Sequence, residues 1–139
     1  MKGKKKQIYV YSTLLLFVFL CTSCGLGAKE TKGTGKKIDF IICKKENIPK
    51  ELKAIIKEKK KKPFQLSYRT KEYTFLVVGY GEQSTKGYSI QVMELYELQK
   101  VAVLKTRLIR STLEERKQGI SYPYFVIKIQ NVDKPISFR

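Results

Sequence analysis

The fold class is decided by residues 64–80, whose sequence is FQLSYRTKEYTFLVVGY. Residues 64–69 and 73–80 are rich in aromatic and β-branched side chains, which favour strands, and the polar residues between them fit a hairpin connection. Further strand-like segments follow at residues 87–98, 101–109, 122–129 and 136–138. This succession predicts a domain dominated by antiparallel sheet.

One strand and one helix are predicted upstream of this region. The strand covers residues 38–43, which are mostly apolar and β-branched. Asn47 can cap the helix and Pro63 ends it. The apolar residues that recur at helical spacing are Leu52, Ile55 and Ile56. We therefore expect an α+β fold with about seven strands and one packed helix, and the pattern leaves open closure as a sandwich or a barrel.

Two features of the strand region are predicted in more detail. Apolar and polar residues alternate from Tyr88 to Val92, but the phase shifts at Met93. Such a shift indicates a β-bulge or a change of the buried face. Residues 110–121 are polar, and they are predicted to form a long connection between strands.

The first residues of the chain are typical of a signal peptide that forms a helix. Lys2 and Lys4–Lys6 make a cationic start, and residues 8–20 form an apolar run. This run is shorter than the ~20 residues that a permanent membrane-spanning helix needs. Residues 1–23 are therefore predicted to be a signal peptide that directs export.

A cysteine follows this segment in a setting that resembles a bacterial lipobox. Thr22 and Ser23 are small, and Gly25 follows Cys24. The resemblance implies that Cys24 is acylated and becomes the new N-terminus, with Cys21 as the alternative site. Two acyl chains would anchor the protein stably to a membrane. We expect it at the outer face of the cytoplasmic membrane, although cleavage without acylation and an uncleaved anchor remain alternatives.

The predicted domain organisation follows from the anchor. Residues 24–36 comprise the acylated cysteine and a glycine-rich, polar linker. Residues 37–139 form the α+β domain. Because Cys43 is then the one cysteine left in the domain, we expect no internal disulfide.

The charge of the chain is strongly positive, at +17. Removal of a lysine-rich leader lowers this value but leaves a basic, lysine-rich domain. Such a surface attracts anionic polymers and lipids. Nucleic acid is not an expected partner, because an exported protein rarely meets it.

Residue types also limit the chemistry. The chain contains no histidine, which excludes Ser-His-Asp, Cys-His and histidine–metal sites. Gly79 and Gly81 precede a strand and not a helix, so they do not form a dinucleotide-binding fingerprint. We expect a non-catalytic protein without cofactor, metal or small-molecule substrate.

Two short motifs carry a family resemblance. They are Thr-Lys-Gly-Tyr-Ser-Ile at residues 85–90 and Tyr-Pro-Tyr followed by a strand at residues 122–129. In this order, they resemble the C-terminal domain of the PrcB family. The resemblance spans residues 73–129, and it implies a non-catalytic, often lipid-anchored subunit that assembles or stabilises a surface protease.

The motifs also supply the predicted partner-binding residues. These are Gly81, Thr85, Lys86, Gly87, Tyr88, Tyr122, Pro123 and Tyr124. The competing interpretation is structural, with glycines that shape a turn and tyrosines that pack in the core. Two other functions are open: inhibition of a protease by the Gly79–Tyr88 loop, and binding of anionic envelope polymers or lipids by the lysines.

Overall fold

The computed structural model describes residues 35–139. The predicted signal helix, Cys24 and most of the predicted linker lie outside these residues. The elements in the described range are β1 (Lys36–Lys37), β2 (Ile41–Ile42), the 3-10 helix η1 (Lys45–Asn47), α2 (Lys50–Lys59), β3 (Pro63–Arg69), β4 (Tyr73–Tyr80), β5 (Gln83–Lys86), β6 (Ser89–Glu97), β7 (Ala102–Ile109), β8 (Lys117–Ser121), β9 (Tyr124–Gln130) and β10 (Ile136–Phe138). The α+β prediction with one α-helix is confirmed for this range.

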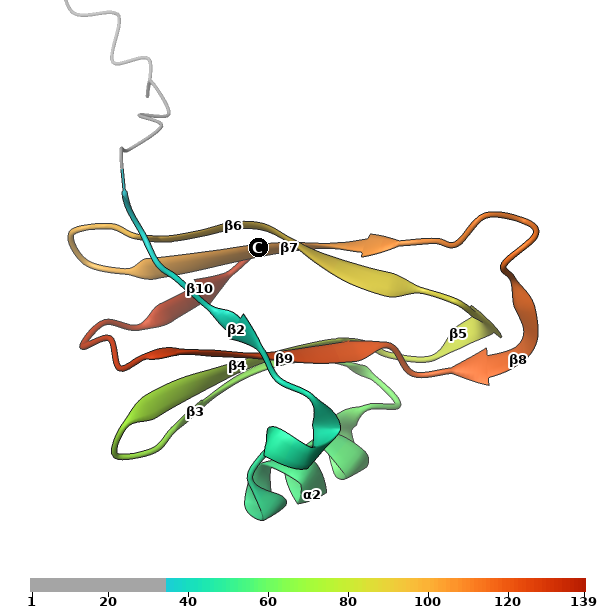
Figure 1. The fold of residues 1–139 in the computed structure, drawn as a ribbon, viewed down its shortest axis with the longest axis horizontal. Coiled ribbons are helices and arrows are strands. Elements are labelled where there is room, and N and C mark those ends of the chain that lie inside the picture. Colours follow the sequence, from blue (N-terminus) through green and yellow to red (C-terminus); the bar gives the residue numbers. More distant parts are fainter. Residues whose placement is uncertain (1–34) are drawn as a thin grey trace, which may run out of the picture. The chain divides into compact units, whose positions relative to one another are not determined.

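Eight of these strands form two sheets that stack face to face (Figure 1). Sheet A has the order β1-β6-β7-β10, and sheet B has the order β2-β9-β4-β3. The pairing is antiparallel except between β7 and β10, which run parallel. Between the sheets lies a cluster that includes Leu76, Leu104 and Ile127, which are fully buried. The domain is therefore a sandwich, which answers the question that the sequence left open.

The helix α2 forms a third layer on the outer face of sheet B (Figure 1). Its buried residues Leu52 and Ile56 pack against Phe75 and Val77 of β4. Both faces of β4 are thus covered, which explains its nearly continuous apolar sequence. Within residues 35–139, no helix has the length and apolar character that crossing a membrane requires.

The predicted start of the helix is wrong by two residues. Asn47 ends the 3-10 helix η1, and the N-cap of α2 is Pro49, whose backbone is extended. No side chain caps the first turn of α2. Pro63, predicted to end the helix, is the first residue of β3. The helix is held by its packing on sheet B more than by a cap.

The predicted strand at residues 38–43 is divided into two short strands. β1 pairs with β6 of sheet A, whereas β2 pairs with β9 of sheet B. Between them, the chain crosses the side of the sandwich, and Ile38 and Phe40 pack against the inner core. A single strand is impossible here because the two ends of the segment pair with different sheets.

The number of strands was also underestimated, since ten are present in the described range and about seven were predicted. Two of the missed strands are β5, inside the predicted polar loop, and β8, inside the predicted connection at residues 110–121. The phase shift predicted at Met93 is confirmed: the register between β6 and β7 shifts between Val92 and Glu94, as in a β-bulge.

Candidate functional site

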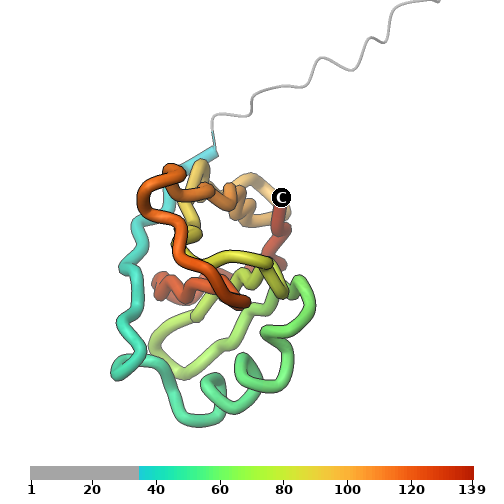
Figure 2. Tube along the Cα trace, turned by 90° about the vertical axis from the view of Figure 1, so that its right-hand side faces the viewer, coloured from blue at the N-terminus to red at the C-terminus, as the bar shows by residue number. Residues whose placement is uncertain are grey.

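The predicted partner-binding residues gather around a two-stranded ribbon of β5 and β8, here called the β5–β8 ribbon. The chain leaves sheet B at the end of β4, passes through β5 and enters sheet A at β6. It returns from β7 through β8 to β9 of sheet B. Figure 2 looks onto this end of the domain and shows the orange segment that contains β8 passing from the upper part to the lower part. The ribbon therefore links both sheets at one end of the sandwich.

The entrance to the ribbon requires Gly81, which has a positive φ of 72°. A Cβ atom at this position would lie 2.7 Å from Cδ and 2.8 Å from the backbone nitrogen of Pro63. No side chain fits against a neighbouring backbone at that distance. Gly81 therefore serves the turn between β4 and β5, as its structural interpretation proposed.

The exit from the ribbon also requires a glycine, Gly87, whose φ is 93°. A Cβ atom there would lie 2.6 Å from Oγ of Ser111. Thr85 and Lys86 precede it in β5, and they pair with Gln118 and Lys117 of β8. Ser121 adds a hydrogen bond of 2.6 Å from its hydroxyl to the carbonyl oxygen of Thr85. Residues 85–86 are thus fixed by their pairing with β8, and the turn that follows them depends on Gly87.

Tyr88 lies at the base of the ribbon beside two cations. The guanidinium carbon of Arg110 is 5.9 Å from the centre of its ring, a cation–π arrangement. A hydrogen bond with the side chain of Thr85, and then Arg110 and Arg116, hold the pKa of the Tyr88 phenol below its ordinary value. Tyr88 is half-buried, so its hydroxyl sits in a positive environment at the surface.

Tyr122 lies after β8 and contacts the segment that leads into β5. Its hydroxyl donates a hydrogen bond of 3.1 Å to Oε2 of Glu82, which precedes β5. This bond, together with the negative charge of Glu82, raises the pKa of the Tyr122 phenol. The ammonium nitrogen of Lys60 lies 5.5 Å from the centre of the same ring. The first residue of the second motif thus contacts the residue before β5 and the end of α2 through side chains.

Pro123 and Tyr124 have structural roles on the sheet B side. The carbonyl oxygen of Pro123 accepts a hydrogen bond of 3.0 Å from the backbone N–H of Tyr80. Tyr124 pairs with Gly79 and packs against the cluster beneath α2. With Tyr122 they line a shallow groove of about 290 Å³ that also includes Ile42 and Cys43.

Two exposed apolar residues in and next to the ribbon were missed by sequence reasoning. Ile120 of β8 is 55% exposed, and Leu113, in the loop before β8, is 79% exposed. A lone apolar residue in a polar segment is a weak signal, so neither residue can be selected from the sequence. Leu113 and Ile120 add apolar area to the predicted set, whose exposed members are mainly polar.

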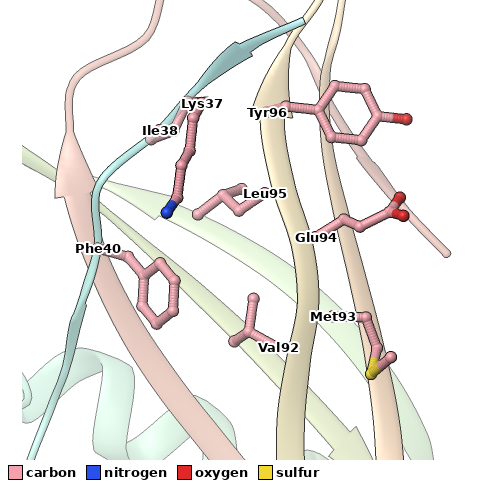
Figure 3. A pocket seen from close by; sticks show the side chains of 8 residues that line it. All are labelled: Lys37, Ile38, Phe40, Val92, Met93, Glu94, Leu95 and Tyr96. Atoms are coloured by element: carbon pink, nitrogen blue, oxygen red, sulfur yellow. The ribbon is translucent and has the colours of Figure 1, made fainter. Parts of the chain in front are cut away.

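A second groove of about 370 Å³ lies where the chain crosses from β1 to β2 (Figure 3). Phe40, Val92 and Leu95 line it from the crossing segment and from β6, with Lys37 among them. Phe40, Val92 and Leu95 belong to the inner core of the sandwich. None of the predicted site residues lines this groove.

The described residues offer binding groups and no catalytic constellation. Residues 35–139 contain no group of three His, Cys, Asp or Glu side chains placed to hold a metal ion. Burial raises the pKa of the Cys43 thiol, an effect that nearby Lys128 only partly opposes, so the thiol form is favoured over the reactive thiolate. The chain contains no histidine, so none of these residues can form a histidine-dependent site.

The described residues form a small β-sandwich domain with one covering helix and a two-stranded ribbon that links the two sheets. Residues 74–130 match the family model described as PrcB C-terminal, so this part of the chain is similar to the PrcB family. The matched range runs from β4 to β9 and includes both strands of the ribbon. No curated protein and no solved structure matches the chain.

Proposed function

We propose that this protein is a non-catalytic accessory subunit that binds a protein of a protease complex through the β5–β8 ribbon. The observation that carries the proposal is the match to the PrcB C-terminal family over residues 74–130, which contain the whole ribbon. Similarity to this family suggests association with a protease complex. The absence of histidine from the chain favours an accessory role over catalysis.

The charges of the ribbon support a partner with acidic groups. Lys86 and Lys117 lie directly opposite each other in the register of β5 and β8. Like charges in such a pair destabilise a sheet. Neither lysine forms an ion pair with any of residues 35–139. A carboxylate of a partner placed between them would remove this repulsion, and exposed Ile120 would add apolar contact at the same place.

The test is co-purification from detergent-solubilised membranes. We expect the protein to recover a protease, and the double variant Lys86→Glu/Lys117→Glu to lower that recovery by about tenfold, because a contact between opposite charges becomes repulsive. The matched control is Lys50→Glu/Lys53→Glu on α2, which should recover the protease at the level of the unchanged protein.

Two results would count against the ribbon proposal. Repeated recovery of the protein without a protease would contradict a protease partner. Equal recovery of the protease by the ribbon and helix variants would show that the contact does not involve the ribbon. A thermal melt of each variant separates loss of binding from loss of folding, because Lys86 and Lys117 are exposed and their replacement should leave the midpoint unchanged.

We also propose that the protein is anchored at the outer face of the cytoplasmic membrane by acylation of Cys24. The support is the leader sequence with its lipobox-like cysteine. We expect Cys24→Ala to move the protein from the membrane to the soluble fraction, whereas Cys21→Ala keeps it in the membrane. Intact mass of the extracted protein then gives the acyl chains and the processed N-terminus. Full-length, unmodified protein in the cytosol would contradict this proposal.

The inhibitor alternative has no comparable observation in its favour. Residues 83–86 of the Gly79–Tyr88 loop are paired with β8 and do not protrude as a free loop. The ribbon therefore fits a broad contact surface better than a loop that enters an active-site cleft.

A further inference from the structure

The strand β3 forms one edge of sheet B, and its outer side is open. β3 pairs with β4 over all seven of its residues, and no strand among residues 35–139 pairs with its other side. A free edge exposes unpaired backbone N–H and C=O groups, to which another extended chain can add. This edge belongs to β3, which is not part of the β5–β8 ribbon.

The direction of the backbone groups of β3 follows from two hydrogen bonds. The N–H of Thr70 donates to the carbonyl of Tyr73 at 2.8 Å, and the N–H of Tyr80 points away from β3 to Pro123 at 3.0 Å. Hydrogen-bonded and non-hydrogen-bonded pairs alternate in an antiparallel ladder. The residues of β3 whose N–H or C=O groups face outward are therefore Pro63, Gln65, Ser67 and Arg69. Pro63 fits this assignment, because it has no N–H to donate.

The edge of β3 lacks most of the features that protect free edges. Protective features include bulges, prolines and lysines within the strand. The register of β3 with β4 contains no shift, and its one proline is the first residue. The two outward positions in the middle, Gln65 and Ser67, are exposed and uncharged. The central part of the edge is thus regular, accessible and able to pair.

Two grooves beside this edge offer space for side chains of an added strand. One of about 500 Å³ includes Gln65, Thr106 and Arg139, and one of about 410 Å³ includes Ser67 and Arg69. Pockets for alternate side chains give specificity to strand addition, while backbone hydrogen bonds give affinity. The hydroxyl, amide and guanidinium groups of the first groove suit polar or acidic side chains, whereas the second groove also contains the carboxylate of Asp133 beside Arg69 and Lys134.

The charges at both ends of β3 identify the kind of chain that fits. The run Lys59–Lys62 leads directly into the strand, and at the other end Arg69, its last residue, and Lys71 lie beside the carboxylates of Glu72 and Asp133. Arg69 is half-exposed and forms an ion pair with Asp133, in which Nη2 of Arg69 lies 3.4 Å from Oδ1 of Asp133. A second copy of this domain would bring two such cationic ends together, which opposes pairing. An extended segment that carries carboxylates would meet opposite charge at each end.

We propose that the outer edge of β3 binds an extended, acidic segment of a partner protein, which adds to sheet B as a fifth strand. The surface is separate from the β5–β8 ribbon, so it provides a second contact with a partner. Its backbone recognition depends on the N–H and C=O groups of Gln65 and Ser67, and its preference for acidic side chains depends on the flanking cations.

The test uses a fluorescently labelled synthetic peptide of alternating Glu and Val residues and measures its binding by anisotropy. We expect Ser67→Pro to weaken binding about tenfold or more, because it removes an outward N–H while the pairing of β3 with β4 remains. The matched control, Ser67→Ala, keeps that N–H and should bind within about twofold of the unchanged protein.

A second arm leaves the protein unchanged. The same peptide, N-methylated at alternate residues, should lose binding, and a peptide with Lys in place of Glu should bind at least about tenfold more weakly. Equal binding of the N-methylated and unmodified peptides, or of the Lys and Glu peptides, would overturn the proposal.

Self-association supplies a further outcome. A dimer of the unchanged protein that Ser67→Pro dissociates would assign the edge to a second copy and would also overturn the proposal. The ribbon variant Lys86→Glu/Lys117→Glu should still bind the Glu peptide, so failure at β3 and failure at the ribbon are distinguishable.

Discussion

Replacement of Leu76 by alanine is expected to lower the free energy of unfolding by about 3–4 kcal/mol. Leu76 lies in β4, is 0% exposed and belongs to the cluster between the two sheets. Its strand is paired on both sides, with Ser67 and Ile127 directly opposite Leu76. Because both sheets are fixed by their ladders, they cannot close around the lost volume, and a cavity remains.

The control for Leu76→Ala is Leu113→Ala, the same chemical change at a residue that is 79% exposed. It should change the free energy of unfolding by no more than about 0.5 kcal/mol. Urea denaturation of both variants gives the comparison. Similar losses for the two would show that the side chain of Leu76 is not enclosed between the sheets.

Replacement of Gly79 by alanine is expected to cost about 2–3 kcal/mol for a different reason, namely overpacking. Gly79 and Phe64 are cross-strand partners in β4 and β3. A Cβ atom on residue 79 would lie 2.2 Å from Cε1 and 2.6 Å from Cδ1 of Phe64. The aromatic ring therefore occupies the space that a side chain on Gly79 would need, and it has to move when the methyl group is added.

A double-mutant cycle separates this clash from a general intolerance at Gly79. Phe64→Leu removes most of the ring, and in that background Gly79→Ala should cost about 1 kcal/mol or less. The interaction free energy is measured from urea denaturation of the two single variants and the double variant. Additive losses would contradict the clash, because they would mean that the ring of Phe64 does not limit residue 79.

These stability variants and the binding variants have different readouts. Leu76 and Gly79 are buried, whereas Lys86, Lys117 and Ser67 are exposed. A loss of partner recovery without a change in the unfolding midpoint therefore points to a contact surface. A loss of both points to the core.

The sequence by itself determined the elements whose residues carry a local pattern. The apolar run of β4 predicted a strand, and the spacing of Leu52 and Ile56 predicted a helix that packs by one face, because burial imposes its period on consecutive residues. The phase shift at Met93 located the bulge for the same reason. The lack of histidine excluded whole classes of catalysis without any structure.

Only the tertiary structure decided the elements whose partners are far away in the chain. β5 and β8 are polar segments without apolar periodicity, and they are strands because they pair with each other although they are far apart in the chain, as between Gln83 and Ser121. The division of residues 38–43 between two sheets has the same origin. Tertiary contacts also determine the different environments of Tyr122, which forms a hydrogen bond with Glu82, and Tyr124, which packs beneath α2. Hydrogen-bond ladders join residues by position in space, and a local pattern of residue types does not contain that information.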